Sequence, residues 1–400
     1  MALLPVADAL ARVIAGVEPT ESETVSLLQA NGRILAAAVA ARLTQPPFDC
    51  SAMDGFAVRH TDVATVPARL VVIGEAAAGH SYSGTIGAGQ CVRISTGAPV
   101  PAGADCVVIQ EDTERDGDTV TVKDVGSPGQ HIRRRGFDFA SGQPMIDAGR
   151  SLEARAIALA AAAGHGSLPV RRRPIVAILA TGDELVEPGE TPAADQIVSS
   201  NSYGLAAMVE AAGGEPRLLG IARDTRASLS AKIAEADGAD ILITIGGASV
   251  GDHDLVGPML QESGAAIDFW RIAMRPGKPL MFGRRGTQRV LGLPGNPVSC
   301  LVTARVFLVP LIRAMLGLDA GTDLETAVLS APIEANGPRQ HYMRASLALR
   351  GAALPTVAPL RSQDSAALSL LASAGCLIVR PAGALATAAG TEVEILRLDV

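Results

Sequence analysis

The strongest constraint on the fold is an alternation of buried strands and helices between about residues 169 and 319. Short apolar segments predict strands at 175–180, 218–221, 240–245, 267–272 and 290–293, and helical spacing predicts helices at 203–212, 227–236 and 297–316. Such alternation forms a doubly wound parallel sheet, because parallel neighbours need a crossover connection. We therefore predict an α/β domain over residues 169–319, with ligands bound in the loops at the carboxyl ends of its strands.

The flanking segments differ in character. Helical spacing runs through about the first 41 residues and returns over 152–164, whereas short β-branched segments between Gly, Pro and Asp lie from 45 to 138. These segments predict a β-domain with antiparallel strands. The fold class is thus multidomain α/β: a discontinuous helical domain (1–46 and 139–168), a β-rich insert (47–138), the α/β domain (169–319) and a small C-terminal β-domain (320–400).

The composition limits the possible partners. A net charge of −7 argues against a broad surface for nucleic acid or membrane, and 3% aromatic residues leave few platforms for stacking bases. No apolar run approaches the roughly 20 residues that span a bilayer. The five cysteines are dispersed and form no C-x-x-C pair, which favours a reducing compartment. We expect a cytoplasmic protein that binds neither nucleic acid nor membrane.

Three loops that follow predicted strands carry polar groups. They are 181–184 (TGDE), 246–254 (GGASVGDHD) and 293–299 (LPGNPVS), and none is a Walker A or a dinucleotide fingerprint. Glycines there let backbone N–H groups approach anionic oxygens, and Asn296 caps a helix whose N-terminus favours negative charge. Glu184 and Asp254 could hold Mg²⁺, although two solvated loop acids explain them equally well.

Cations gather near a fourth strand end. Arg271, Arg275 and Lys278 lie in RIAMRPGKP, and together with the acidic loops they suit a site that handles phosphate and metal.

The β-rich insert contains three further motifs. PFDCSAMDGFA (47–57) carries Asp49, for which a capped turn is favoured, and Asp54, which could face a metal or a polar ligand. TGAPVPAGAD (96–105) is a rigid loop of Pro and Gly. HIRRRGFD (131–138) suits a phosphate-bearing ligand, but a solvated basic turn is the commoner explanation of such a run.

Taken together, these motifs resemble the molybdopterin molybdenumtransferases, the MoeA-type enzymes of molybdenum cofactor biosynthesis. PFDCSAMDGFA, TGAPVPAGAD, IRRRGFD, TGDEL, GGASVGDHD, RPGKP and GLPGNPVS occur in family order from residue 47 to 299. The resemblance implies that adenylylated molybdopterin and molybdate are the substrates, that AMP leaves in a Mg²⁺-dependent step, and that the protein is a homodimer with sites shared between subunits. It also leaves room for a molybdopterin adenylyltransferase as partner.

The resemblance also implies roles for individual residues. Catalytic positions are Asp54, Thr96, Asp138, Glu184, Asp224 and Asp254, of which Glu184 and Asp254 would bind the metal. Substrate-binding positions are Gly246, Gly247, Ser249, Arg271, Arg275, Lys278, Asn296, Ser299, Arg344 and Ser365. The chain departs from the family where Arg271 and Arg275 replace lysines, which changes hydrogen-bond geometry. Cys50 and Phe56 stand where Asn and Tyr are common.

Two other functions are compatible with part of this pattern. A molybdopterin adenylyltransferase would share the α/β domain but would not need the motifs of the β-rich insert. A non-catalytic scaffold such as gephyrin has the same architecture, yet no added partner-binding region is visible in the sequence.

Overall fold

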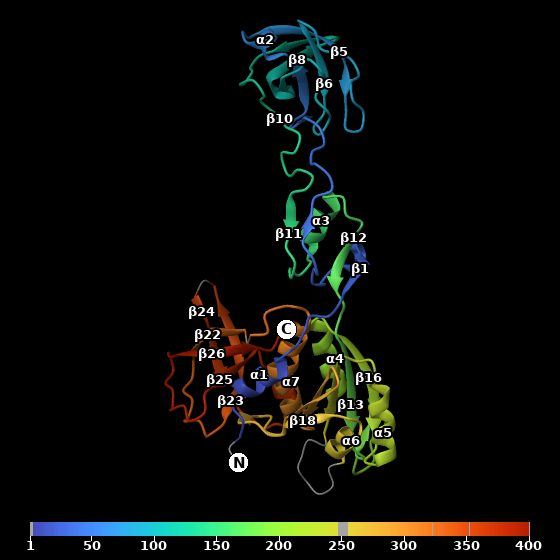
Figure 1. Ribbon diagram of the computed structural model, residues 1–400. Coiled ribbons are helices and arrows are strands. Elements are labelled where there is room, and N and C mark those ends of the chain that lie inside the picture. The colour runs from blue at the N-terminus through green and yellow to red at the C-terminus, as the bar shows by residue number, and fades with distance from the viewer. Residues whose placement is uncertain (1–2, 247–254, 322, 352, 400) are drawn as a thin grey trace. The chain divides into compact units, whose positions relative to one another are not determined.

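The computed structural model describes residues 3–246, 255–321, 323–351 and 353–399. It divides into two compact units, each described here by itself (Figure 1). The larger unit comprises Met1–Glu23 and Arg171–Val400, and the smaller unit comprises Thr24–Val170. The first 23 residues therefore group with the α/β part of the chain, whereas residues 1–46 were expected in the discontinuous helical domain.

The larger unit contains most of the helices. They are α1 (Val6–Ile14), α4 (Asn201–Ala211), α5 (Arg226–Glu235), α6 (Val256–Glu262), α7 (Pro297–Met315) and α8 (Leu368–Ala372). The strands of its main sheet are β13 (Ile175–Thr181), β16 (Glu215–Ala222), β17 (Ile241–Ile245), β18 (Ala266–Phe269), β20 (Met281–Arg285) and β21 (Gln288–Leu293), and a separate short pair is β14 (Leu185–Val186) with β15 (Ile197–Val198).

The main sheet has the order β16-β13-β17-β21-β20-β18. Its first four strands run parallel, as expected, whereas β20 runs antiparallel to both neighbours because a tight turn joins it to β21. The chain leaves β13 for β16 on one side and then continues to β17 on the other. This reversal opens a crevice at the carboxyl ends of β13 and β17, the usual ligand position in such sheets.

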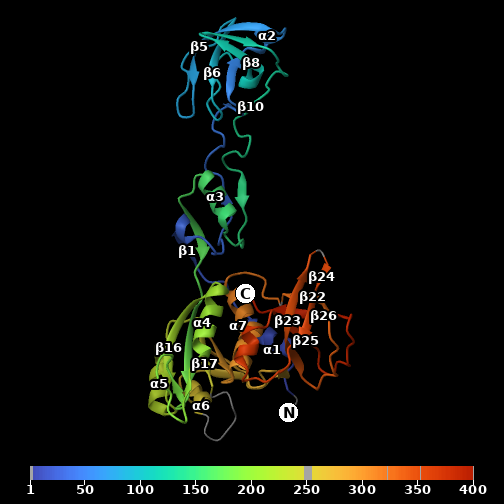
Figure 2. The same cartoon turned by 180° about the vertical axis from the view of Figure 1, so that it is seen from behind.

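Helices cover both faces of the main sheet. On one face α5 packs against α6, and their apolar side chains share a core with Leu179, Leu242 and Met281 of the strands. On the other face α4 and α7 pack together, and Figure 2 shows these two helices side by side. Burial on both faces explains the nearly continuous apolar sequence of β13 and β17.

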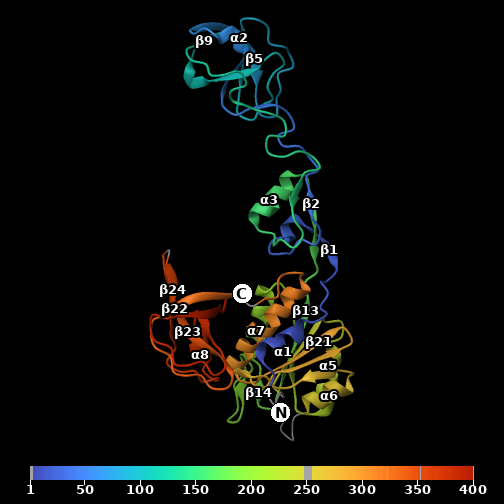
Figure 3. The ribbon, with the colours of Figure 1, turned by 60° about the vertical axis from the view of Figure 1, so that its left-hand side comes forward.

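The N-terminal helix ends earlier than helical spacing predicts. Residues Val6, Ala9 and Val13 are buried, and α1 lies against α7 (Figure 3). The predicted continuation to about residue 41 is wrong, because Pro19 and the β-branched, polar run at 20–26 favour extended backbone. The strand β1 (Ser22–Ser26) occupies part of that segment.

Helix α7 is the core helix of the larger unit. Among the described residues it is the one helix whose length and mean hydropathy, 1.7, would suffice to cross a membrane. However, 83% of its apolar stretch is buried inside the protein, so packing against the sheet and α4 accounts for its composition.

The C-terminal part of the larger unit is a small β-barrel. Its strands are β22 (Leu324–Leu329), β23 (Gln340–Arg350), β24 (Ala353–Pro359), β25 (Cys376–Arg380) and β26 (Glu392–Arg397), joined at one edge by β19 (Met274–Arg275). An additional pairing of β23 with β25 closes the sheet. The predicted C-terminal β-domain is thereby confirmed, and β19 extends it with Arg275, the first residue of the RPGKP motif.

The smaller unit is built around a mixed sheet. Its elements are η1 (Leu27–Gln29), β2 (Val39–Ala40), β3 (Cys50–Ser51), β4 (Gly55–Val58), α2 (His60–Val63), β5 (Ala68–Ala76), β6 (Gln90–Ile94), β7 (Cys106–Ile109), η2 (Gln110–Asp112), β8 (Thr113–Asp116), β9 (Thr119–Val122), β10 (Ile132–Arg133), β11 (Pro144–Ile146), α3 (Ala154–Ala162) and β12 (Ser167–Arg171). The sheet order is β7-β4-β6-β5-β9-β8, and the expectation of purely antiparallel pairing is wrong for β5 and β6, which pair in parallel.

The β-rich insert enters and leaves through neighbouring strands. Gln45 and Phe139 form an antiparallel bridge, in which each backbone N–H donates to the other residue's carbonyl at 2.9 and 3.3 Å. Beyond this bridge, Leu35, Leu152 and Leu168 pack in one buried cluster. Two chain segments far apart in sequence therefore share one core, as the discontinuous arrangement predicted.

Candidate active site

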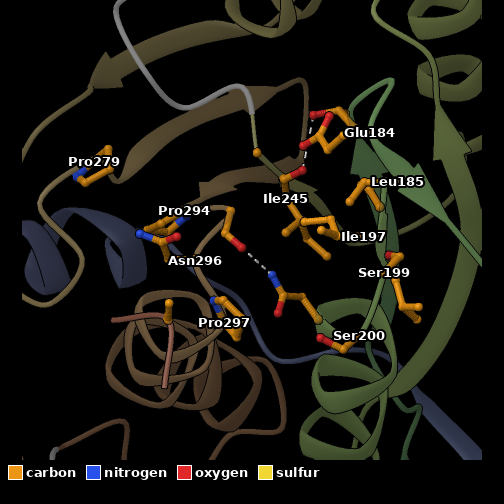
Figure 4. A pocket seen from close by; sticks show the side chains of 17 residues that line it. Glu184, Leu185, Ile197, Ser199, Ser200, Ile245, Pro279, Pro294, Asn296 and Pro297 are labelled. Carbon is orange, nitrogen blue, oxygen red and sulfur yellow. Dashed lines mark hydrogen bonds between the residues drawn. The ribbon is translucent and has the colours of Figure 1, made fainter. Parts of the chain in front are cut away.

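A pocket of about 620 Å³ lies at the carboxyl ends of the parallel strands (Figure 4). Its floor is formed by residues at the ends of β13, β17 and β21, and one side is formed by the β14–β15 pair. The lining residues are Ala180, Thr181, Glu184, Leu185, Ile197, Val198, Ser199, Ser200, Asn201, Ile245, Gly246, Pro279, Pro294, Gly295, Asn296, Pro297 and Ala366. The pocket thus occupies the crevice that the strand order creates.

Hydrogen bonds join the loops of the pocket floor. The Thr181 hydroxyl donates to the carbonyl of Ile245 at 3.1 Å, and the Asn201 side-chain amide donates to the carbonyl of Gly295 at 2.7 Å (Figure 4). Gly246 has φ +87°, and a Cβ there would lie 3.0 Å from the Thr181 carbonyl oxygen. A side chain at position 246 would therefore strain the floor and push the strand ends apart.

The pocket wall is uneven in polarity. The exposed side chains of Ile197 and Val198 form an apolar side, while Glu184 contributes a carboxylate and Asn296 an amide. Among the lining residues that the structure describes, none is Lys or Arg. The pocket therefore suits a largely uncharged heterocycle better than the phosphates attached to it.

Three carboxylates converge beside the pocket. Asp224 follows β16, and its backbone N–H donates to Asp183 Oδ1 at 3.1 Å. The pKa of the Asp224 carboxyl is raised, first by partial removal from solvent and then by the negative charges of Asp183 and Glu184. This negative potential favours a cation at Glu184.

The structure tests the predicted metal site only in part. Asp254 lies outside the described residues, as do Gly247 and Ser249, so their predicted roles stay predictions. Within the described part of the chain, no group of three or more His, Cys, Asp or Glu side chains is arranged to hold a metal ion. A cation at Glu184 would consequently need ligands from residues 247–254, from the substrate or from water.

The start of α7 meets the C-terminal part of the chain at the pocket. The Asn296 amide donates to the Ser365 hydroxyl at 3.1 Å, and the Val298 N–H donates to the Ser365 carbonyl at 3.1 Å. Ser299, in the same first turn, is buried. Asn296 is the residue before the helix, as predicted, but its side chain does not cap α7. The structure therefore brings Asn296 and Ser365 together, and Ser299 lies three residues after Asn296 in α7.

Arg344 has a different environment from the one expected of a molybdate ligand. Only 1% of the residue is exposed, and its guanidinium donates to the carbonyls of Ser362 and Ala367, both at 3.2 Å. Gln363 is bound to the Arg344 backbone at 2.9 and 3.0 Å. Arg344 thus anchors the loop that carries Ser365, and any effect it has on an anion is electrostatic or through this loop.

Positive charge accumulates near the junction of β19 and the barrel. Burial and then the charges of Arg275, Arg339, Arg344 and Arg380 lower the pKa of His341 to about 4. His341 is therefore neutral near pH 7, and the four guanidinium groups make the surrounding potential positive. Arg275 pairs with His341 in the register of β19 and β23.

The remaining predicted cations are solvent-exposed. Arg271 and Lys278 lie on either side of the turn that begins at Arg275, and Pro279, next to Lys278, lines the pocket. Gly277 in this turn has φ +99° and packs against Thr303 of α7. The turn therefore holds Lys278 at the rim of the pocket.

In the smaller unit, the three sequence motifs are joined by backbone pairing. Strand β3 of PFDCSAMDGFA pairs with β10 of HIRRRGFD, and Cys50 bridges to Pro99 of TGAPVPAGAD. The Thr96 N–H donates to Asp54 Oδ1 at 2.8 Å, so these two predicted residues are neighbours. Asp138 is exposed, with its backbone N–H bound to Gln45.

Gly55 explains why glycine follows Asp54. A Cβ at this position would lie 1.9 Å from the carbonyl oxygen of Val108 in the paired strand β7. Backbone atoms cannot move aside cheaply, so only glycine allows β4 and β7 to pair here. The tight pairing fixes where the Asp54 carboxylate emerges from the sheet.

Asp49 has the structural role that the sequence favours. Its carboxylate accepts hydrogen bonds from the Arg135 N–H at 2.8 Å and from the Arg134 guanidinium at 2.7 Å, and these contacts lower its pKa. Asp49 thus ties PFDCSAMDGFA to HIRRRGFD, and Arg134 is engaged by Asp49.

Replacing Asp49 with Asn is expected to lower stability near pH 7 by about 0.5 kcal/mol, a small value because the ion pair is solvent-screened. A depressed carboxyl pKa stabilises the folded state above the unfolded pKa of about 4, and this contribution is lost as pH falls through the folded pKa. Thermal melts of both proteins from pH 7 down to about pH 2 should therefore differ at pH 7 and converge only below the unfolded pKa of about 4. A difference that stays constant with pH would contradict this origin.

Three family models together match most of the chain. One described as the MoeA N-terminal region (domain I and II) matches residues 4–164, one described as a probable molybdopterin binding domain matches 177–314, and one described as the MoeA C-terminal region (domain IV) matches 326–398. The chain is also 39% identical to the molybdopterin molybdenumtransferase of Nostoc sp., over 95% of this chain and 89% of the relative. The chain belongs to the molybdopterin molybdenumtransferase family.

Further relatives cover the chain to the same extent. Molybdopterin molybdenumtransferase 2 of Mycobacterium tuberculosis is 37% identical over 93% of this chain and 94% of its own length. The crystal structure of a molybdopterin biosynthesis MoeA protein from Pyrococcus horikosii matches over 100% of both chains with a TM-score of 0.85 and 31% identity. Matches on both sides of the α/β domain favour the molybdenumtransferase family over an enzyme that shares only that domain.

Sequence reasoning missed several residues in or beside the pocket. Asp183 belongs to the acidic group, Arg223 contacts the loop that carries Glu184, and Asn201 crosses the pocket floor. A signal was present for Asp183 and Arg223, because both lie in loops that follow predicted strands of the parallel sheet. For Asn201 the sequence held no such signal, since its hydrogen bond to the Gly295 carbonyl depends on how α4 packs beside α7.

Proposed function

We propose that the chain inserts molybdenum from molybdate into adenylylated molybdopterin and releases AMP. The observation that carries this proposal is the pocket of about 620 Å³ at the strand reversal, inside the segment that matches a molybdopterin-binding domain. Its apolar side, formed by Ile197 and Val198, suits the flat face of a heterocycle, and the floor amide of Asn201 can fix the ring's orientation.

The phosphates belong near the rim in this proposal. Glu184 and Asp254 would hold Mg²⁺, for which carboxylate oxygens are suitable ligands, and the negative potential around Asp224 supports a cation there. When bound, Mg²⁺ would neutralise phosphate charge and polarise phosphorus towards water. Lys278 and Arg275, which lie outside the pocket lining, would bind the anionic oxygens of molybdate.

The direct test is to incubate the protein with adenylylated molybdopterin, Mg²⁺ and molybdate. AMP release and a cofactor that activates a molybdenum-dependent apoenzyme are expected, and both should require molybdate. Absence of AMP release under these conditions would exclude the proposed activity.

Molybdate is proposed to bind where the α7 N-terminus meets the barrel. Lys278, Arg275, Ser299 and Ser365 are the candidates, with Arg344 holding the Ser365 loop in place. Hydroxyls together with exposed positive charges suit a tetrahedral dianion, because charge-assisted hydrogen bonds are about twice as strong as neutral ones.

Lys278→Ala should raise the molybdate concentration that gives half-maximal turnover by about tenfold, equivalent to about 1.4 kcal/mol. Binding of adenylylated molybdopterin should change little, because Lys278 lies outside the pocket lining. Lys232→Ala is a matched control, since Lys232 lies on α5 and pairs with Glu235. An unchanged molybdate dependence in Lys278→Ala would exclude this location.

The same proposal includes a homodimer in the cytoplasm that can receive its substrate from a molybdopterin adenylyltransferase. All five cysteines are free and buried, which accords with a reducing compartment. The sulfurs that take up molybdenum would come from the substrate, so the reaction needs no reactive protein thiol.

A further inference from the structure

The loop that carries Glu184 curves around one arginine. Arg223 directly follows β16, the strand beside β13, and its Nη1 donates to the carbonyls of Leu185 at 3.0 Å and Asp183 at 3.1 Å. A longer contact of 3.4 Å reaches the carbonyl of Gly182. One guanidinium thus binds the backbone on both sides of Glu184.

The same loop has little freedom to move elsewhere. The Gly182 N–H donates to the Ala222 carbonyl at 3.1 Å, and the Ile197 N–H donates to the Glu184 carbonyl at 2.8 Å. Gly182 has φ +147°, and a Cβ there would lie 2.4 Å from Glu184 Oε2. The Glu184 carboxylate therefore lies over Gly182, a position whose backbone conformation favours glycine.

Electrostatics give Arg223 a second effect on this loop. The Asp224 N–H donates to Asp183 Oδ1 at 3.1 Å, and Glu184 is next to Asp183 in the chain, so three carboxylates lie around the loop that Arg223 binds. Without the guanidinium, repulsion among these charges would favour a more open loop. Carbonyls that lose a charged donor would also turn towards water.

We infer that Arg223 is a positioning residue, which holds the loop at residues 182–185 so that Glu184 faces the pocket. This inference rests on the proposed function of Glu184. Arg223 itself touches the loop backbone and not the pocket, since it is not among the lining residues. Arg is better suited than Lys, because its planar group can serve several carbonyls at once.

The test is Arg223→Met compared with Arg226→Met. Arg226 is also exposed, begins the neighbouring helix α5 and pairs with Glu262 at 2.5 Å, so it controls for loss of a nearby positive charge. Arg223→Met is expected to lower kcat for AMP release about fivefold and to raise the Mg²⁺ concentration for half-maximal turnover. The KM for adenylylated molybdopterin should change less than about twofold, because Arg223 lies outside the pocket lining.

Arg223→Lys should recover part of the lost kcat.

A double-mutant cycle with Glu184→Gln distinguishes failure of the inference about Arg223 from failure of the proposed role of Glu184. If Arg223 acts through Glu184, adding Arg223→Met to Glu184→Gln should slow the enzyme no further, and amide hydrogen exchange at residues 183–186 should increase in Arg223→Met but not in Arg226→Met. Independent, multiplicative losses would overturn the inference, as would normal turnover of Arg223→Met beside a slow Glu184→Gln variant. Normal turnover of Glu184→Gln would overturn the proposed role of Glu184 and the inference with it.

Discussion

Replacing Glu184 with Gln is expected to slow AMP release at least about tenfold, which corresponds to about 1.4 kcal/mol in the activation barrier. The carboxylate lies on the pocket wall, beside Asp183 and Asp224, in the most negative part of the described site. Gln keeps the size and the hydrogen-bonding shape of the side chain but removes its charge, so the loss reports on cation binding.

The measurement is AMP release as a function of Mg²⁺ concentration. Glu184→Gln should need more Mg²⁺, and Asp254→Asn, at the second predicted ligand, should show the same shift. Glu235→Gln serves as control, because Glu235 is an α5 carboxylate paired with Lys232. Wild-type turnover at saturating Mg²⁺ in both site variants would show that neither carboxylate supports the reaction.

Mixing the Asp54→Ala and Glu184→Ala proteins is expected to restore part of the activity that each lacks alone. Asp54 belongs to the smaller unit and Glu184 to the larger one. In the proposed homodimer, each reaction uses Asp54 from one subunit and Glu184 from the other. Random exchange makes half of the dimers mixed, each with one intact pair of two, so recovery of about a quarter of wild-type activity is expected.

A matched control mixes Asp54→Ala with Asp138→Ala. Both changes affect the smaller unit, so every mixed dimer would lack one of the two residues at each site and should stay inactive. Subunit exchange is verified by co-purification of differently tagged subunits. If exchanged Asp54→Ala and Glu184→Ala subunits remain inactive, each chain supplies its own complete set of residues.

The helices and strands that the sequence predicts best are those whose hydrophobic pattern follows the burial of their side chains. The strands predicted at 175–180 and 240–245 occur within one residue of those bounds, because apolar residues there are buried on both faces of the sheet. The strand at 281–285 was missed, since its sequence MFGRR includes a glycine and ends in two arginines. Its position depends on the hairpin with β21, which is a tertiary property.

The sequence predicted where in the fold the candidate site lies, but it did not predict most of the contacts within that site. Loops after parallel strands meet at one sheet edge, so Thr181, Glu184 and Gly246 could be placed together from strand order alone. The burial of Arg344 could not be predicted from the sequence, because it depends on how the carbonyls of residues 362 and 367 pack against its guanidinium. Charge in a sequence indicates a possible anion ligand, but only packing decides whether the charge is already engaged.

The bridge between Gln45 and Phe139 has a consequence for how this protein can change. The β-rich insert begins and ends next to the hydrogen-bonded residues Gln45 and Phe139. For the stability of the core outside the insert, residues 47–138 therefore act as a closed loop. Loop-closure entropy grows only logarithmically with length, so doubling such a loop costs about 0.6 kcal/mol. The insert also has buried clusters of its own, around Val58 and Val107. Mutations or insertions in the β-rich insert, or its replacement, can therefore alter the surface around Asp54 while the core around Leu35, Leu152 and Leu168 remains folded.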